Sequence, residues 1–252
     1  MINNNFFERL SDRFEKKRSL LCVGLDPHQN LADTPVKAFR FCVDVIEKTK
    51  DLALCYKINS AFFEVYGPFG MGSLQKLTNY LNYSELPFIL DTKRSDIGST
   101  AESYAQSIFE TYGADATTVN PLMGYDSVKP FTNYTHRGTF ILCVTSNPGM
   151  KDFLDDLYLK ILDFSQKIDA HDNVGLVVAG TYPSYFKEIR EKYDGWILVP
   201  GIGYQGGKLE EILKNIKNKE APRTLLSMSR SLYSDDIQKT AQEIVNKIRT
   251  IL

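Results

Sequence analysis

Residues 87–113 read PFILDTKRSDIGSTAESYAQSIFETYG, and this stretch contains the structural unit that recurs along the whole chain. It starts with a short apolar run that is typical of a buried strand. A charged segment follows and leads into an amphipathic stretch that ends at Gly113. Glycine is a common residue just after a helix. The stretch therefore predicts one β-strand followed by one α-helix.

Short apolar runs of the same kind recur at an average spacing of about 29 residues. They are LLCVGLD from residue 20, ALCYKI from 53, PFILD from 87, DATTVN from 115, TFILCV from 139, NVGLVVAG from 173, WILVP from 196 and RTLLSM from 223. This spacing fits a strand plus a crossover helix, and near-continuous apolar strands are typical of a parallel sheet covered on both faces. Eight such units predict a closed (β/α)8 barrel, an α/β fold also known as a TIM barrel.

No linker rich in glycine or proline divides the chain, so we expect residues 1–252 to form a single domain. Length alone would also permit two modest domains. A doubly wound open sheet is the alternative architecture, although it suits fewer strands. Phe6, Phe7, Leu10 and Phe14 recur at helical spacing and predict a short N-terminal helix packed on the barrel.

The composition is that of an ordinary globular protein, with 43% hydrophobic residues among 252. Because 30 Lys and Arg residues balance 31 Asp and Glu residues, the overall charge excludes a strongly basic nucleic-acid-binding protein. No run approaches the roughly 18 apolar residues of a membrane helix, and the first residues lack the apolar core of a signal peptide. The four cysteines have no paired spacing and are interpreted as buried, reduced thiols. We therefore expect a cytoplasmic protein without a membrane or nucleic-acid partner.

Polar residues follow almost every predicted strand, at the end where (β/α)8 barrels carry their active sites. In strand order they are Asp26, Lys57 with Asn59, Asp91 with Lys93, Asn120, the run Thr145-Ser146-Asn147, the segment PGIGYQGG and Ser229 with Arg230. Convergence from seven strands predicts a site at the barrel mouth.

The segment ILDTKRSDIGST, residues 89–100, carries the densest group of charges. Asp91 and Lys93 are two residues apart, so on an extended backbone both side chains face the barrel mouth. Asp96 follows as the chain turns into the next helix, and Lys57 lies one strand away. We expect two lysines and two aspartates to alternate in charge around one small volume. The alternative is a structural ion-pair network in which Ser95 or Asp96 caps the helix.

The glycine-rich segment PGIGYQGG, residues 200–207, follows the seventh strand and precedes a helix that is expected to begin near Lys208. The loops after strands seven and eight form the usual phosphate site of such barrels, with backbone N–H groups and a helix N-terminus facing the anion. Arg230 adds a guanidinium group suited to phosphate, and Gln205 adds an amide donor. The segment also fits a dinucleotide-binding pattern, but only weakly, because it lies in the seventh unit and lacks the accompanying acid. A glycine turn beside a surface arginine is the remaining interpretation.

The residue types favour a reaction carried out by lysine and aspartate without metal or organic cofactor. No His, Cys and carboxylate set has the spacing of metal ligands, and no nucleophile elbow supports a Ser-His-Asp triad. An ammonium group in a water-poor pocket stabilises a developing carbanion and then donates a proton. A phosphate far from the reacting atoms supplies binding energy.

The pattern Asp91-x-Lys93-x-x-Asp96-Ile97-Gly98-x-Thr100 resembles the signature of the orotidine 5′-phosphate decarboxylase family. LCVGLDPH, KINSAFFE, TVNPLMGYDSV, VTSNPG, VPGIGYQGG and SRS resemble, in this order, motifs of its type 2 branch. These blocks run from about residue 20 to residue 233, nearly the whole chain. Two departures are Ile58, where the branch often has proline, and Tyr204, where a small residue is common.

The resemblance implies a carboxy-lyase of pyrimidine biosynthesis that converts orotidine 5′-phosphate to uridine 5′-phosphate and CO2 without a cofactor. Lys93 would protonate the carbon that loses CO2, and Lys57, Asp91 and Asp96 would complete a charged tetrad. The further substrate-binding residues that the resemblance implies are Asp26 and Thr100 at the ribose, Ser146 at the pyrimidine, Gln205, Ser229 and Arg230 at the phosphate, together with Ile97 and Pro200. It also implies a homodimer in which Asp96, Ile97 and Thr100 enter the partner's site.

Two other functions stay open. A sugar-phosphate decarboxylase or aldolase-like synthase on the same barrel also carries the pattern D-x-K-x-x-D, but such enzymes stabilise an enediolate with Mg²⁺ and place an acid at the end of strand two. Lys57 stands there in this chain and would repel the metal. The other candidate, from a different class, is a non-catalytic barrel that binds a phosphate ligand.

Overall fold

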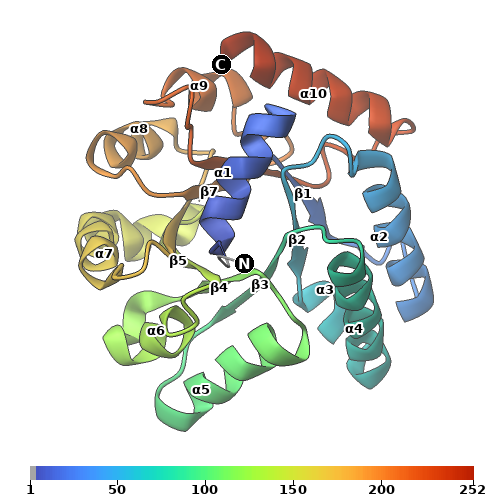
Figure 1. Cartoon of the computed structure of the whole chain (residues 1–252), viewed down its shortest axis with the longest axis horizontal. Helices are drawn as coiled ribbons and strands as arrows, with labels where there is room; N and C mark the ends of the chain where they lie inside the picture. Colours follow the sequence, from blue (N-terminus) through green and yellow to red (C-terminus); the bar gives the residue numbers. More distant parts are fainter. Residues whose placement is uncertain (1–3) are drawn as a thin grey trace.

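The protein forms a closed barrel of eight parallel strands, β1 to β8, in the order of the sequence (Figure 1). A computed structural model describes residues 4–252. Each strand pairs with the next, and β8 pairs with β1 through Leu21 opposite Leu226. This closure confirms the predicted (β/α)8 fold and excludes the doubly wound open sheet.

The strands coincide with the eight apolar runs. They are β1 (Leu21–Leu25), β2 (Cys55–Asn59), β3 (Phe88–Arg94), β4 (Ala116–Val119), β5 (Gly138–Val144), β6 (Val174–Val178), β7 (Ile197–Val199) and β8 (Thr224–Met228). Nearly every strand residue is buried because the barrel interior is filled on one side and helices cover the other. The exceptions are at the ends of β2 and β3, where the chain becomes polar and partly exposed.

Ten α-helices are described in residues 4–252, and Figure 1 shows α2 to α10 arranged around the strands. Their bounds are α1 (Phe6–Lys17), α2 (Pro35–Thr49), α3 (Ala61–Glu64), α4 (Gly67–Tyr83), α5 (Gly98–Gln106), α6 (Tyr125–Thr132), α7 (Leu154–Ile168), α8 (Pro183–Lys192), α9 (Leu209–Lys214) and α10 (Ile237–Ile251). A π-helical turn, Ser107–Thr111, extends α5, and 3₁₀ turns lie at Pro121–Met123 and Pro148–Asp152. The local sequence fixes where several helices begin. The side chains of Thr34 and Asp236, for example, accept hydrogen bonds from backbone N–H groups at the N-termini of α2 and α10.

Helix α1 closes the end of the barrel where the strands begin. It starts at a capping box formed by Asn5 and Glu8, and its apolar side is buried as the sequence predicted. Phe6 lies close to Gly138 at the start of β5, and Phe7 stacks on Trp196 just before β7. In Figure 1, α1 crosses the middle of the ring of helices. With this end covered, the opposite end, where the strands terminate, is the open mouth.

No helix within the described part of the chain is long and apolar enough to cross a membrane. All four cysteine side chains are buried, as expected from the apolar runs that contain them.

Candidate active site

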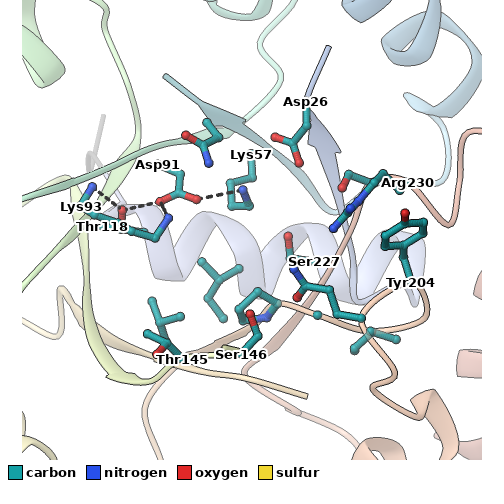
Figure 2. A pocket seen from close by; sticks show the side chains of 18 of the residues that line it. Asp26, Lys57, Asp91, Lys93, Thr118, Thr145, Ser146, Tyr204, Ser227 and Arg230 are labelled. Atoms are coloured by element: carbon teal, nitrogen blue, oxygen red, sulfur yellow. Dashed lines mark hydrogen bonds and ion pairs between the residues drawn. The ribbon is translucent and has the colours of Figure 1, made fainter. Parts of the chain in front are cut away.

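A cavity opens at the mouth of the barrel, where the strands end. Nine of the twelve predicted catalytic and substrate-binding residues line it: Asp26, Lys57, Asp91, Lys93, Ser146, Pro200, Gln205, Ser229 and Arg230. Figure 2 shows that its charged side chains lie in two groups, with Lys57, Asp91 and Lys93 on one side and Arg230 on the other. The cavity thus has a lysine–aspartate group on one side and an arginine on the other, an arrangement that was expected from the residues at the strand ends.

Asp91 is the centre of the first group (Figure 2). One carboxylate oxygen accepts a hydrogen bond from Lys57 Nζ at 3.0 Å. The other accepts from Lys93 Nζ at 2.6 Å and from Thr118 Oγ1 at 2.7 Å. Three strands, β2, β3 and β4, contribute to this arrangement, so the barrel register holds the two ammonium groups on either side of one carboxylate.

Burial and charge together set the ionisation of this group. The Asp91 carboxyl is buried, which on its own raises its pKa, but Lys57 and Lys93 outweigh burial and hold that pKa well below its ordinary value. For the Lys57 ammonium the two effects have the opposite signs. Burial on its own lowers its pKa, but the charges of Asp91 and Asp26 outweigh burial and raise that pKa above its ordinary value. Both groups are therefore charged at neutral pH, in a place where water is largely excluded.

The two lysines differ in their access to the cavity. The Lys57 side chain is 9% exposed, whereas that of Lys93 is 46% exposed. Lys57 is thus enclosed by the barrel, and Lys93 presents its ammonium group to whatever enters the mouth. Of the two, Lys93 is the one placed to reach a ligand atom.

Lys93 reaches this position by a route that differs from the expected extended strand. The pairing of β3 with β4 shifts register between Leu90 and Arg94, and Lys93 has a φ of 48°, in the left-handed region. Its backbone N–H donates to Thr118 Oγ1 at 3.0 Å. A non-glycine residue in this region is strained, and the surroundings that hold it there are often functional sites. The irregular strand thus aims the Lys93 side chain back at Asp91.

Asp26 lies between the two charged groups (Figure 2). Its Oδ1 atom is buried and has no hydrogen-bond partner within residues 4–252. The hydroxyl of Tyr233 accepts from Asp26 N at 3.0 Å and donates to Gly24 O at 2.6 Å, which fixes the end of β1. An unpaired, buried carboxylate oxygen is costly unless a ligand supplies the donor, so Asp26 is suited to accept a bond from a ligand hydroxyl.

The loop after β7 wraps the second charged group. Gly201, Gly203 and Gly206 have φ values of 85°, 80° and 91°, which only glycine adopts readily. Gln205 folds back over Gly201. A Cβ added to Gly201 would lie only 2.8 Å from the side-chain oxygen of Gln205. The loop leads into α9 after Lys208, as predicted. Gln205, Ser229 and Arg230 all line the cavity at this side.

Three predicted site residues lie away from the cavity of this chain: Asp96, Ile97 and Thr100 do not line it. Asp96 turns back to accept from the backbone N–H of Ile97 at 2.8 Å, and Ile97 is 51% exposed. The single chain therefore brings together Lys57, Asp91 and Lys93 but not the second aspartate of the expected cluster. The role of Asp96 in a partner's site stays a prediction.

Several lining residues were not singled out from the sequence, namely His28, Phe62, Thr118, Ser227 and Ser231. Thr118 is the most consequential, because it contacts both Asp91 and the backbone of Lys93. In the sequence it is one of two threonines in an apolar strand, where a β-branched residue indicates packing. The only sign of a role at the site was that Thr118 lies near the end of the strand expected to neighbour β3. His28 stacks edge-on against Phe62 at 4.5 Å and forms part of the wall.

These features define a (β/α)8-barrel protein with a lysine–aspartate centre and a glycine-rich loop at its mouth. Among the described residues, no group of three or more His, Cys, Asp or Glu side chains is placed to hold a metal ion. The model of the orotidine 5′-phosphate decarboxylase / HUMPS family matches residues 19–244. The chain belongs to this family.

Individual relatives agree with the family match. The chain is 42% identical over 246 residues to an orotidine 5′-phosphate decarboxylase of Roseiflexus castenholzii, covering 92% of this chain and 90% of the relative. It superposes on the OMP decarboxylase structure of Leishmania donovani with a TM-score of 0.89 and 37% identity, covering 98% of each chain. The UMP synthase structure of the same organism gives a TM-score of 0.92 and 38% identity, but this chain, 98% of which is covered, spans only 56% of that longer one.

Proposed function

We propose that the protein is an orotidine 5′-phosphate decarboxylase that forms uridine 5′-phosphate and CO2. The observation that carries this proposal is the row Lys57–Asp91–Lys93, in which two ammonium groups flank one buried carboxylate at the barrel mouth. Relatives that bear this name cover more than nine-tenths of the chain at about 40% identity. We also propose that the chain belongs to the type 2 branch, forms one domain and works in the cytoplasm as a step of pyrimidine biosynthesis.

The reaction assigns a separate role to each charged group. The bond between C6 of the pyrimidine and its carboxylate breaks, the electron pair stays on C6, and CO2 leaves. Lys93, the exposed ammonium, stabilises the developing carbanion and then transfers its proton from Nζ to C6. Asp91 holds Lys93 in position, and Lys57 keeps Asp91 charged from the buried side. No metal or organic cofactor takes part in these steps.

The rest of the cavity binds the nucleotide. Asp26, with its unpaired buried oxygen, accepts a hydrogen bond from a ribose hydroxyl. Ser146 forms a hydrogen bond with the edge of the pyrimidine, beside Pro200. Gln205, Ser229 and Arg230 hold the phosphate. Because this contact is remote from the reacting carbon, its binding energy positions the base against Lys93 and Asp91.

Lys57 favours this reaction over a Mg²⁺-dependent one on a sugar phosphate. It is buried within β2, on the strand where such an enzyme would place an acid for its metal, and its positive charge repels a cation. A non-catalytic phosphate-binding barrel would have no use for the half-exposed Lys93 held against Asp91 in a strained backbone conformation.

The test of the function is the ultraviolet absorbance of orotidine 5′-phosphate incubated with the purified protein in excess chelator. We expect rapid loss of the orotate absorbance, with uridine 5′-phosphate as the product. If the absorbance changes neither with nor without chelator, the decarboxylase proposal is wrong; sugar phosphates with added Mg²⁺ are then the next substrates to try. Turnover that disappears with chelator would contradict the metal-free mechanism alone.

We further propose that the active unit is a homodimer with shared sites. Asp96, Ile97 and Thr100 lie outside this chain's own cavity, and the loops after the neighbouring strands β3 and β4 expose apolar side chains, Ile97, Leu122 and Met123. In a dimer these residues would be covered, and Asp96, Ile97 and Thr100 would complete the partner's site.

Mixing two inactive variants tests the shared site. Lys93→Ala and Asp96→Asn each disable every site in their own homodimers, but a mixed dimer contains one site with both residues intact. Unfolding and refolding an equal mixture should therefore restore about a quarter of the wild-type activity. No recovery from a mixture that refolds into dimers would show that Asp96 serves its own chain.

A further inference from the structure

Arg230 lies over the ring of Tyr204, and the carbon of its guanidinium group is 3.7 Å from the ring centre (Figure 2). Tyr204 lies between Gly203 and Gln205 in the glycine-rich loop, and it is 67% exposed. Both side chains line the mouth of the cavity on the side opposite Asp91 and Lys93. The ring of Tyr204 thus faces the guanidinium group at the cavity mouth.

The environment of Arg230 differs from that of the other arginines that lie over rings. Arg94 lies 4.8 Å from the Tyr104 ring and pairs with Glu64, and Arg18 lies 5.1 Å from the Phe14 ring beside Glu15. Those two arginines have a carboxylate partner for their charge, and Arg190, 5.9 Å from the Phe186 ring, donates to the backbone oxygens of Tyr193, Gly195 and Arg223. Within residues 4–252, the Arg230 side chain forms no ion pair and no hydrogen bond, although its stacking distance is the shortest of the set.

Stacking and hydrogen bonding use different parts of a guanidinium group. The ring contacts the flat face, while the five N–H donors lie in the plane and point outward, where they can meet phosphate oxygens. A carboxylate partner would occupy those donors and compete with the phosphate. The aromatic face instead restricts a long, flexible side chain and leaves all of its donors free.

The two loops that carry this pair are joined at the residues next to it. A Cβ on Gly203 would lie 2.9 Å from the Cβ of Ser231, so the loops approach as closely as glycine permits. Gly203 precedes Tyr204, and Ser231 follows Arg230. The backbone around Tyr204 also closes on itself, because Gly203 N donates to Gly207 O and Gly206 N to Gly203 O, both at 2.9 Å. The ring is therefore presented from a fixed turn.

We propose that Tyr204 is a positioning residue that holds the Arg230 guanidinium over the phosphate end of the cavity before the nucleotide binds. This inference rests on the proposed function for the identity of the nucleotide, and on the stacked pair for the role of Tyr204. The ring makes no contact with the reacting atoms. Its effect is on the affinity for the phosphate group.

The test compares the binding of uridine 5′-phosphate, uridine and inorganic phosphate by calorimetry. Tyr204→Ala should weaken the binding of uridine 5′-phosphate about five-fold, because it removes one cation–π contact at a half-exposed site. Tyr204→Phe keeps the ring and should bind within about two-fold of the wild type. Tyr83→Ala is the matched control, since Tyr83 is 91% exposed at the C-terminal end of α4 and does not line the cavity. The affinity for uridine should be the same in all four proteins.

A double-mutant cycle with Arg230→Ala separates action through Arg230 from a general effect on the loop. In that background, Tyr204→Ala should change the affinity for uridine 5′-phosphate by less than about two-fold. For the decarboxylation, the single variant should raise KM by the factor measured in binding and leave kcat within about two-fold. Equal losses with and without Arg230, a loss that Tyr204→Phe shares, or weakened binding of uridine would each overturn the proposal.

The outcomes distinguish this inference from the function on which it rests. If the wild type binds inorganic phosphate but neither turns over orotidine 5′-phosphate nor binds the nucleotide, the decarboxylase proposal fails. The role of Tyr204 is then decided by the affinity of the same variants for inorganic phosphate. If the wild type binds no phosphate compound, the inference about Tyr204 is overturned as well.

Discussion

The two ends of the cavity are built on opposite principles. At one end, every charge is paired inside the protein: Asp91 accepts three hydrogen bonds, and both lysines contact it. At the other end, Arg230 has no carboxylate partner within residues 4–252 and stacks on a neutral ring. The first end is buried among strands, and the second is formed by two loops.

This contrast separates the chemistry of the site from its binding. Charges that must act on a transition state are most effective when they are already oriented, and a network that satisfies itself keeps that orientation without a ligand. A group that must capture an anion needs free donors, and a paired arginine would lose affinity. We therefore expect changes at the Asp91 end to affect turnover and stability, and changes at the Arg230 end to affect substrate affinity.

The largest expected effect is that of Lys93→Ala. It removes the only half-exposed ammonium group of the Asp91 end, so turnover of orotidine 5′-phosphate should fall by about 10⁴-fold or more. The fold should persist, because Lys57 still pairs with Asp91. Steady-state kinetics and circular dichroism measure the two effects.

Lys160→Ala is the control for loss of a lysine, since Lys160 lies exposed on α7. That variant should match the wild type in both measurements. Near-normal turnover by Lys93→Ala would remove the basis for assigning the chemistry to this end of the cavity.

Asp91→Asn should have the next largest effect, on stability as well as on turnover. It leaves the buried Lys57 ammonium without its main partner, and breaking a buried ion pair in this way costs about 3–5 kcal/mol. Chemical denaturation at pH 7 measures this loss. Arg230→Ala, at the other end, should leave the free energy of unfolding unchanged within about 0.5 kcal/mol. Similar losses in both variants would contradict the contrast between the two ends.

The pH dependence of that loss has a definite sign. In the wild type, the lowered pKa of Asp91 gives stability that is present above about pH 4 and lost as pH falls, and the raised pKa of Lys57 gives stability that is lost only as pH rises past about 10. Asp91→Asn removes the charge that offsets the burial of Lys57, so the folded-state pKa of that lysine falls. The unfolded chain then binds more protons, and the variant gains stability as pH rises. The gap in melting temperature between variant and wild type should therefore narrow from pH 6 to pH 9; a constant gap would contradict this account.

Arg230→Ala should act mainly on substrate affinity. Losing charge-assisted hydrogen bonds to the phosphate should raise KM for orotidine 5′-phosphate by roughly 100-fold. Orotidine, which lacks the phosphate, should be turned over by the variant and by the wild type at the same low rate. A variant that slows both substrates equally would show that Arg230 belongs with the chemistry and not with binding.

Most of the fold could be predicted from the sequence because each strand is an apolar run and each run recurs at the length of one βα unit. The N-terminal helix followed from the spacing of four apolar residues, all of which are buried. The register of β3 could not be predicted. Alternation places Lys93 on an extended strand, whereas pairing with β4 introduces an irregularity there and a φ of 48°. Such a feature depends on the neighbouring strand and not on the local sequence.

The candidate site divides in the same way. Asp26, Lys57, Asp91 and Lys93 could be located because the ends of parallel strands meet at one mouth. Thr118 could not, since a threonine within an apolar strand is typical of packing. Asp96 lies away from this chain's cavity, so one folded chain does not bring the predicted cluster of two lysines and two aspartates together. The sequence shows which residues stand at the mouth, and the three-dimensional contacts show which of them are paired.

The smallest effect that we predict concerns Tyr233, which connects the end of β1 to the loop after β8. Its hydroxyl bonds both Gly24 O and Asp26 N, and its ring lies edge-on against Phe41. Tyr233→Phe keeps the ring but leaves two buried backbone groups without a partner, so it should cost about 1–2 kcal/mol of stability. Asp26, which lies between the two ends of the cavity, should then be held less firmly. We expect KM to rise a few-fold for orotidine 5′-phosphate and for orotidine alike, because the ribose is common to both. An increase confined to the phosphate-bearing substrate would instead place Asp26 at the Arg230 end, and the division of the cavity would have to be drawn elsewhere.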